Sequence, residues 1–326
     1  MNPYGAVVAA RRRLYEAGIL RSERVGAPVV SIGNLTWGGT GKTPFLAFLA
    51  GRFEAAGRRV GIVSRGYRRR SSGVVVVSDG ASILASPDAA GDEPYLLASR
   101  FPRAVVVVAE KRAEGAREAI RLGAEILLLD DAFQHLSIER DLDVVLVDAD
   151  DPWGGGLPPG GRGRERPAAL SRADLVVVTR ASKGVSSAAD REVPRWTRAP
   201  VFHCRLRFAG WFSGGAPAVL PAGARAFAFC AVGNPQSFRA TLSEAGVAPA
   251  DFAVFRDHHA YTERDLRSLE ERAERAGASV LLTTEKDAVK LAGKTALPLV
   301  AARIEAEIFE PGFEEQVDRR LAERTR

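Results

Sequence analysis

The sequence Thr36-Trp37-Gly38-Gly39-Thr40-Gly41-Lys42-Thr43 lies between an apolar run at residues 28–32 and a stretch of helical spacing at residues 41–56. Glycines let backbone N–H groups turn inward, and a helix N-terminus adds partial positive charge, so this order of elements favours phosphate binding. In such a Walker A loop, Lys42 reaches the β- and γ-phosphates and Thr43 holds a metal ion. Thr36 replaces the usual first glycine. We predict a nucleotide-binding loop made by Thr36, Gly38, Gly39, Thr40, Gly41, Lys42 and Thr43.

Short, almost wholly apolar runs alternate with helical stretches along the first half of the chain. Strands of this kind are buried on both faces, which is typical of a mostly parallel sheet covered by helices on both sides. We therefore expect an α/β fold of the P-loop NTPase kind, with a doubly wound, mostly parallel sheet. The predicted strands are residues 28–32, 60–64, 105–108, 126–129, 144–147 and 175–178, and helices are predicted at residues 41–56 and 112–122.

The composition changes after this first half. Gly, Pro and Arg crowd together at residues 151–167, and a second loose region at residues 181–200 is the candidate linker. Beyond it, a charged helical stretch at residues 262–276 lies among three further β-rich runs, at residues 225–230, 279–283 and 298–302. We predict two domains: residues 1–190, which bind the nucleotide, and residues 191–326, a smaller α/β domain.

The overall composition is that of a folded protein, with 46% hydrophobic and 26% charged residues in a chain of 326. A formal net charge of +6 suits acidic partners, namely phosphates, nucleic acid or anionic lipid. Cys204 and Cys230 fit neither a zinc site nor a redox pair, so we expect both to be reduced and structural. With no signal-peptide pattern and no apolar run of spanning length, we expect the protein on the cytoplasmic side.

Residues 5–22 combine apolar positions at helical spacing with four nearby arginines, Arg11, Arg12, Arg13 and Arg21. The segment is therefore predicted to be an amphipathic, basic helix. Two roles remain open from the residues alone. It packs on its own domain as an ordinary first helix, or it lies on the surface of an anionic bilayer, a common use of such helices.

An acidic pair follows the apolar run at residues 126–129. Asp130 and Asp131 stand where a Walker B strand carries its carboxylates, which hold Mg²⁺ against the nucleotide phosphates. Paired acids at a strand end also cap turns, but beside a phosphate loop we favour the metal role. Gln134 and His135 are then expected close to the nucleotide.

The nucleotide base is expected to be adenine. Guanine is read by an Asn/Thr-Lys-x-Asp motif, and residues 284–287 have the order Thr-Glu-Lys-Asp instead. A phosphotransferase acting on a hydroxyl needs a carboxylate or imidazole near the acceptor and cations near the transferred group. Arg112 and the arginines at 162, 164 and 166 are candidate phosphate ligands, with ordinary solvated charge as the alternative.

Two segments supply candidate acid or base groups. Asp92 lies in Gly91-Asp92-Glu93-Pro94, at the start of a helical stretch, where it is either a proton acceptor or an ordinary N-cap. The segment Asp257-His258-His259 sets a carboxylate beside imidazoles, which orient or assist a base near neutral pH.

Six motifs taken in this order resemble the tetraacyldisaccharide 4′-kinase family, from the first helix to about residue 291. They are residues 34–44 around the phosphate loop, Ser64-Arg65-Gly66-Tyr67, Gly91-Asp92-Glu93-Pro94, Asp130-Asp131-Ala132-Phe133-Gln134-His135, Asp257-His258-His259 and Thr284-Glu285-Lys286-Asp287-Ala288-Val289-Lys290. The resemblance implies transfer of the ATP γ-phosphate to the 4′-hydroxyl of an acylated glucosamine disaccharide 1-phosphate, a step of lipid A biosynthesis that uses Mg²⁺. It also implies two α/β domains and a first helix that contacts the cytoplasmic face of the inner membrane peripherally. We expect a monomer that binds no nucleic acid.

The resemblance assigns roles by position. Asp92 matches the family's catalytic base and His258 the histidine that supports it. Lys42 and Thr43 match the phosphate-loop pair, and Asp130 and Asp131 the metal-site acids. Further positions that the family associates with its active site are matched by Tyr67, Arg112, His135, Arg164 and Glu165.

The sequence departs from the family pattern in two places. Ala132 stands where the family usually has glycine, and the loop at residues 157–165 carries an extra residue ahead of Arg164 and Glu165. Two rival functions remain as alternatives. A regulatory P-loop ATPase would hydrolyse ATP rapidly without a lipid acceptor. A kinase for a soluble sugar or nucleoside would act equally on a deacylated acceptor and would not need the basic amphipathic start.

Overall fold

The computed structural model describes residues 2–221 and 223–324. The strands are β1 (Val29–Asn34), β2 (Val60–Ser64), β3 (Val75–Asp79), β4 (Val105–Val108), β5 (Ile126–Asp130), β6 (Leu142–Asp148), β7 (Leu175–Thr179), β8 (Val201–Ser213), β9 (Ala216–Ala218), β10 (Ala226–Cys230), β11 (Asp251–Val254), β12 (Val280–Thr284) and β13 (Leu299–Ile308). The α-helices are α1 (Pro3–Glu16), α2 (Lys42–Ala55), α3 (Pro87–Ala90), α4 (Asp92–Arg100), α5 (Arg112–Arg121), α6 (Ala188–Glu192), α7 (Pro235–Glu244), α8 (Glu263–Arg275), α9 (Glu285–Leu291) and α10 (Phe313–Arg324). Two 3₁₀ helices are η1 (Pro167–Arg172) and η2 (Val193–Arg195).

In the described part of the chain the strands form one sheet in the order β11-β10-β12-β13-β8-β7-β6-β1-β5-β2-β4-β3, with β9 paired to β8. The strand before the phosphate loop, β1, lies between β5 and β6 and is parallel to both. Most other pairs are parallel as well, and the antiparallel ones are β3 with β4, β8 with β13 and β8 with β9. This confirms the predicted mostly parallel α/β sheet.

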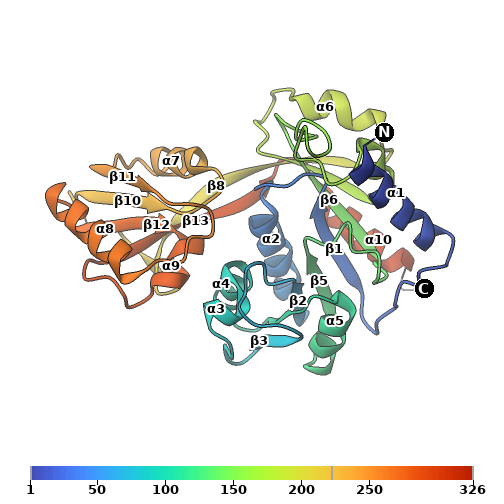
Figure 1. Cartoon of the computed structure of the whole chain (residues 1–326), viewed down its shortest axis with the longest axis horizontal. Coiled ribbons are helices and arrows are strands. Elements are labelled where there is room, and N and C mark those ends of the chain that lie inside the picture. The colour runs from blue at the N-terminus through green and yellow to red at the C-terminus, as the bar shows by residue number, and fades with distance from the viewer. Residues whose placement is uncertain (1, 222, 325–326) are drawn as a thin grey trace.

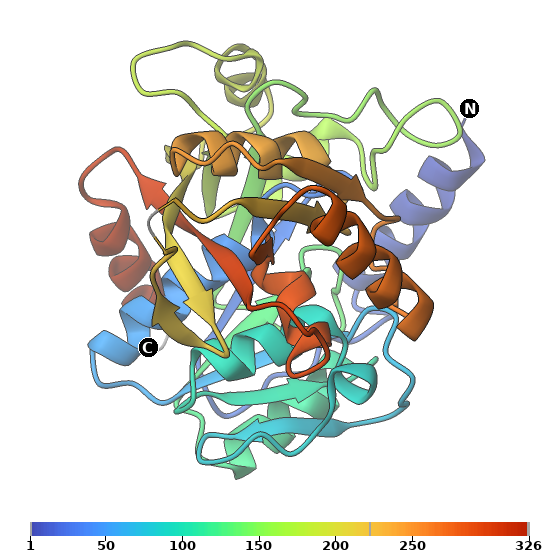
Figure 2. The same cartoon turned by 90° about the vertical axis from the view of Figure 1, so that its left-hand side faces the viewer.

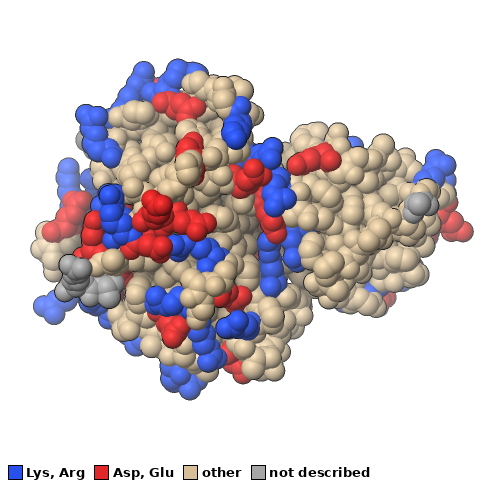
Figure 3. Space-filling model, turned by 180° about the vertical axis from the view of Figure 1, so that it is seen from behind, with Lys and Arg blue, Asp and Glu red and all other residues tan. Residues whose placement is uncertain are grey.

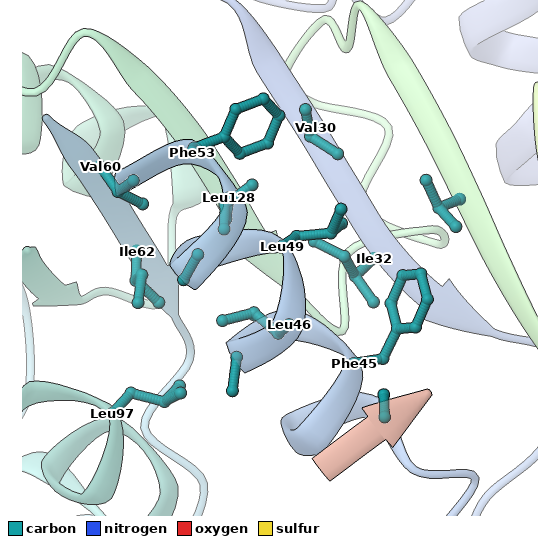
Figure 4. Packing of buried hydrophobic residues seen from close by; sticks show 14 of the residues in the cluster. Val30, Ile32, Phe45, Leu46, Leu49, Phe53, Val60, Ile62, Leu97 and Leu128 are labelled. Atoms are coloured by element: carbon teal, nitrogen blue, oxygen red, sulfur yellow. The ribbon is translucent and has the colours of Figure 1, made fainter. Parts of the chain in front are cut away.

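Helix α2 covers one face of the sheet behind the phosphate loop. Its Phe45, Leu46 and Leu49 are completely buried against Ile32 and Ile62 of the strands (Figure 4). Each such side chain contributes about 2 to 3 kcal/mol through its burial. The helix that carries Lys42 at its first position is therefore held firmly on the sheet.

Helix α5 covers the opposite face. Small residues, among them Ala116 and Ala119, let it lie close to Val63 and Leu129, which point away from α2. Because successive residues of one strand face opposite sides, both sets must be apolar when both faces are covered. This explains the almost unbroken apolar runs in the sequence.

Strands β8 and β13 carry the chain between the two ends of the sheet (Figure 1). They pair antiparallel, and the ion pairs Arg205–Glu307 and Arg207–Glu305 cross between them at 3.0 and 3.1 Å. Seen from behind, blue and red side chains lie next to each other at the narrow join of the two lobes (Figure 3). The sheet is thus continuous from one lobe into the other.

The prediction of a linker at residues 181–200 is wrong. This stretch contains α6 and η2, and its Ala189 and Val193 are buried against the β6 and β7 side of the sheet. Strand β8 makes the crossing instead. The small lobe beyond it contains β10, β11, β12 and part of β13, with helices α7, α8 and α9 (Figure 2). A division into independent domains at residues 190 and 191 stays a prediction.

The last helix, α10, returns to the large lobe after β13. Phe313 and Val317 are buried there, and the Phe313 ring packs edge-on against Phe45 at 5.8 Å and Phe202 at 5.1 Å. The chain end therefore completes the core under α2. The sequence patterns described above do not predict this helix.

The first helix is shorter than expected. Helix α1 begins at Pro3, because the Asn2 side chain accepts from the Gly5 amide, and it ends at Glu16. Gly18 follows with φ of 70°, a left-handed conformation that ends helices and favours glycine. Of the residues expected on one helix, 5–22, the last six lie beyond its end.

Within residues 2–221 and 223–324, none of the helices combines the length and the apolar character needed to cross a bilayer. Cys204 and Cys230 are free and buried, and burial raises the pKa of both thiols to about 12. Both thiols are therefore protonated at neutral pH, as a structural role requires.

Candidate active site

A buried hydrogen bond between side chains stabilises the phosphate loop. At the end of β1, the Asn34 Nδ2 donates to the Thr40 Oγ1 at 2.8 Å, and both side chains are buried. Gly41 is the N-cap of α2 with φ of 80°, and a Cβ there would also lie 3.2 Å from Leu206. Gly41 offers no side chain to the first amides of α2, so these amides can bind an anion. Lys42 and Thr43 follow on the first turn.

A second loop, at residues 154–165, holds the phosphate loop from outside. The Trp37 amide donates to the Arg162 carbonyl and the Arg164 amide donates to the Leu35 carbonyl, both at 2.7 Å. The Arg162 side chain pairs with Asp151 and lies so close to Gly38 that a Cβ there would come within 3.0 Å of it. The extra residue in this loop does not remove Arg164 from the site.

Two cationic side chains lie against the Asp131 carboxylate. The Arg164 Nη1 donates to its Oδ1 at 2.6 Å, and the Lys42 Nζ lies 3.7 Å from the same oxygen. Burial alone would raise the pKa of Asp131, but Lys42 and Arg164 outweigh it and hold this pKa below its usual range. Its φ of 51° places it in a left-handed turn directly after β5. Asp131 is therefore ionised and fixed.

Asp130 is buried more deeply than Asp131, and nearby positive charges offset its negative charge less fully. It accepts a hydrogen bond from the Ser64 Oγ at 2.8 Å, and burial, together with Glu93 and Asp131, raises its pKa. An ionised carboxylate that is buried in this way is costly unless a positive charge lies nearby. Mg²⁺ is usually bound by one or two carboxylates together with substrate phosphates. Asp130, Asp131 and the Thr43 hydroxyl therefore fit a magnesium ion.

Arg112 lies against the acidic pair, and His135 lies near Arg112. Arg112 is buried and donates to the Ala109 carbonyl at 2.7 Å and to the Asp130 carbonyl at 3.4 Å. Burial lowers its pKa to about 10, so it stays charged at neutral pH. Burial and the neighbouring Arg112 lower the pKa of His135 to about 4, so this imidazole is neutral.

Glu165 is held in place by two partners. Arg172 donates to both of its carboxylate oxygens, at 2.8 and 3.0 Å, and the Gln134 Nε2 donates to it at 3.2 Å. Gln134 also donates to the Asn34 carbonyl at 2.9 Å. Glu165 thus connects the second loop to the strand before the phosphate loop.

Asp92 and His258 meet across the two lobes. Asp92 begins α4, whose start follows Gly91 at φ of 88°, and its Oδ2 lies 3.2 Å from the His258 Nδ1. The Lys290 Nζ lies 3.4 Å from the same oxygen. Burial favours the neutral acid, but His258 and Lys290 hold the pKa of Asp92 below its usual range. The carboxylate is therefore ionised at neutral pH.

The Asp92 cluster adjoins the phosphate-loop cluster. Glu93, the residue after Asp92, is close enough to raise the pKa of Asp130. The ring of Tyr67 meets the ring of His258 edge-on at 5.1 Å. An ionised carboxylate from α4 thus lies near the acidic pair beside the phosphate loop.

A family model described as tetraacyldisaccharide-1-P 4′-kinase matches residues 2–322 of this chain. The chain belongs to this family. Two curated relatives are each called tetraacyldisaccharide 4′-kinase. One from Chlorobaculum parvum is 40% identical over 307 residues, which cover 92% of this chain and 85% of the relative. One from Anaeromyxobacter sp. (strain Fw109-5) is 42% identical over 316 residues, covering 94% and 85%.

A solved structure of the same family is also similar. The crystal structure of LpxK from Aquifex aeolicus in complex with ATP has a TM-score of 0.79 and 30% sequence identity, and the match covers 98% of this chain and 96% of that one. The tetraacyldisaccharide-1-P 4′-kinase fold therefore extends over both lobes. It also includes α10, beyond the point near residue 291 where the sequence motifs end.

Most residues expected in the kinase site come together. His259 does not, because its Nε2 lies 3.0 Å from Asp265 at the start of α8. Two lysines, Lys286 and Lys290, also lie in this cluster, and the sequence alone indicates no role for them. Their spacing of four residues on a helix is the signal that places both on one face, towards α4.

Proposed function

We propose that this chain transfers the γ-phosphate of ATP to the 4′-hydroxyl of a tetraacylated glucosamine disaccharide 1-phosphate in lipid A biosynthesis. The observation that carries the proposal is the ionised Asp92, backed by His258, beside the phosphate loop. Membership of the tetraacyldisaccharide-1-P 4′-kinase family supports the substrate class. The crystal structure of the Aquifex aeolicus relative in complex with ATP supports ATP as the phosphate donor.

The amides at the start of α2 and the Lys42 ammonium group would bind the phosphates of ATP. Asp92 would accept the proton of the 4′-hydroxyl as the oxygen forms its bond to the γ-phosphorus and the bond from that phosphorus to the β–γ bridging oxygen breaks, releasing ADP. His258 would orient Asp92 by donating to it. Arg112 and Arg164 would offset negative charge around the phosphates.

Thr43, Asp130 and Asp131 would hold Mg²⁺, which neutralises charge on the phosphate oxygens during transfer. This assignment rests on the donor set and on the unbalanced buried charge of Asp130. The protein's own contribution is the fixed position of the two carboxylates. Asp131 is anchored by Arg164, and Asp130 is anchored by Ser64.

The direct test is product formation. Purified protein incubated with Mg-ATP and the tetraacyl disaccharide 1-phosphate is expected to yield a bis-phosphorylated lipid, detected by mass spectrometry. Rapid ATP hydrolysis with no phosphorylated lipid would identify a regulatory ATPase instead. Equal activity on a deacylated acceptor would point to a kinase for soluble sugars.

We propose further that α1 and the turn after it bind the cytoplasmic surface of the inner membrane peripherally. Val7 and Ile19 are each 69% exposed, and in α1 no residue is buried. Trp37 of the phosphate loop is also exposed and lies 5.7 Å from the ring of Tyr4. Arg12 and Arg13 add positive charge that anionic lipid attracts. The phosphate loop would then lie close to the bilayer.

Replacing both Val7 and Ile19 with glutamate is expected to weaken binding to anionic phospholipid vesicles by about tenfold or more, because two apolar contacts are lost and two like charges are added. Co-sedimentation with vesicles measures this. Val219→Glu is the matched control, since Val219 is 88% exposed but lies in the small lobe, after β9. An equal loss in the control would contradict a specific role for α1.

A further inference from the structure

His258 has a partner on each ring nitrogen. Its Nδ1 lies 3.2 Å from the Asp92 Oδ2, and its Nε2 lies 2.9 Å from the Lys286 Nζ. An ionised carboxylate only accepts hydrogen bonds, and an ammonium group only donates them. With both partners charged, Nδ1 must carry the proton and Nε2 must offer its lone pair. The two contacts together specify one neutral tautomer.

The surroundings favour a charged Lys286. Its Nζ lies 3.3 Å from the Glu93 Oε1 and 3.6 Å from the Asp257 Oδ1, so two further carboxylates face the ammonium group. Its side chain is 17% exposed, which limits screening by water. The contact between Lys286 and His258 is therefore an ammonium-to-imidazole hydrogen bond.

The other groups around His258 agree with this arrangement. From α9, Lys290 approaches Asp92 at 3.4 Å and adds a second positive charge near the imidazole. From the segment after β2, the Tyr67 ring packs edge-on against the imidazole and Arg68 donates to the Asp257 carbonyl at 2.8 Å. The backbone of His258 is itself held in a left-handed conformation, with φ of 58°. Protonating Nε2 would put two donors face to face.

We propose that Lys286 is a positioning residue that holds His258 as a neutral imidazole with its proton on Nδ1. His258 then donates to Asp92 but is blocked from taking a second proton. A proton removed from the acceptor hydroxyl would stay on Asp92 rather than pass through the imidazole. The kinetic part of this inference rests on the proposed role of Asp92 as base, whereas the tautomer itself does not.

The tautomer can be measured without any substrate. The chain has four histidines, so ¹⁵N-labelled imidazole signals can be assigned to His258 by comparison with His258→Gln. At pH 7 we expect a protonated Nδ1 and an unprotonated Nε2. In Lys286→Met, where no ammonium group faces Nε2, we expect a doubly protonated ring at pH 6. Lys286→Arg, which keeps a donor-only cation, is expected to retain the neutral form.

The matching kinetic test measures the rate of each variant at several pH values and divides it by the wild-type rate at the same pH. In this ratio the effects of other titrating groups cancel. For Lys286→Met, this ratio is expected to fall about tenfold from pH 8 to pH 6, because an imidazolium beside Asp92 weakens the base. Between pH 8 and pH 6 this ratio should change by less than twofold for Lys286→Arg and for Lys294→Met, an exposed control just after the turn that follows α9.

Three results would overturn the inference. One is a wild-type His258 that is protonated on both nitrogens at pH 7. Another is a Lys286→Met variant whose His258 signals match those of the wild type. The last is a Lys286→Met variant that changes only the KM for ATP, at every pH alike, which would make Lys286 a nucleotide ligand. If the NMR pattern holds but neither the wild-type protein nor any variant phosphorylates the lipid, the proposed function fails and the tautomer assignment stands.

Discussion

Replacing Asp92 with asparagine is expected to lower kcat by about 10²- to 10⁴-fold, the usual contribution of a general base. Asparagine has nearly the same shape and keeps an oxygen that accepts from the His258 Nδ1. The variant therefore removes proton acceptance while the contact between the lobes remains. Phosphate transfer from ATP to the acylated disaccharide, followed with labelled ATP, measures the loss.

Two comparisons make the Asp92 result specific. The Kd for ATP is expected to change by less than about twofold, since the phosphate loop is untouched. Asp88→Asn is the control, because Asp88 lies on α3, just before α4, and forms only an exposed pair with Arg70 at 3.5 Å. If Asp92→Asn retained a kcat within threefold of wild type, another group would have to accept the proton.

Replacing Lys42 with alanine is expected to lower kcat/KM for ATP by about 10²- to 10³-fold, as loss of one well-placed cation at the transferred group does in other enzymes. Lys42 is at the first position of α2, and its ammonium group lies 3.7 Å from the Asp131 Oδ1. Asp131 keeps its bond from Arg164, so the acidic pair should not collapse. Steady-state kinetics and calorimetric ATP binding test this.

The control for Lys42 is Lys183→Ala, an exposed lysine in the turn before α6. It is expected to leave both the rate and the ATP affinity unchanged, and thermal unfolding should be the same for all three proteins. Undiminished ATP binding and turnover in Lys42→Ala would mean that the nucleotide lies elsewhere, which would remove the basis for the proposed mechanism.

The parts of the site that depend on neighbouring residues could be predicted from the sequence. The phosphate loop and the Asp130–Asp131 pair each follow a buried apolar strand, and parallel strands end at one edge of the sheet. The structure places Lys42 3.7 Å from Asp131, although they are far apart in sequence. The unbroken apolar runs were sufficient to predict these strands, because both of their faces are covered by helices.

The contact between Asp92 and His258 could not be derived from such patterns. The two residues are 166 positions apart and belong to different lobes, so only the family resemblance linked them. The role of Lys286 was missed for the same reason. Its partners come from α4 and from the turn before α8, and nothing in the local sequence indicates that these segments meet α9.

The connection between the lobes was mispredicted for a different physical reason. Strand β8 alternates charged residues such as Arg205 and Arg207 with apolar ones, because along the join one face of the sheet is exposed to water, and there these arginines pair with glutamates of β13. It therefore lacks the unbroken apolar run used to find the other strands. The region at residues 181–200 looked loose because α6 and η2 are very short.

Helix α10 has a consequence for synthesis on the ribosome. Phe313 and Val317 fill space beneath α2 in the nucleotide-binding lobe, yet they are translated after all of the small lobe. Until α10 has left the ribosome, the rings of Phe45 and Phe202 lack their neighbour Phe313. The large lobe, although encoded first, can only finish folding after the small lobe has emerged.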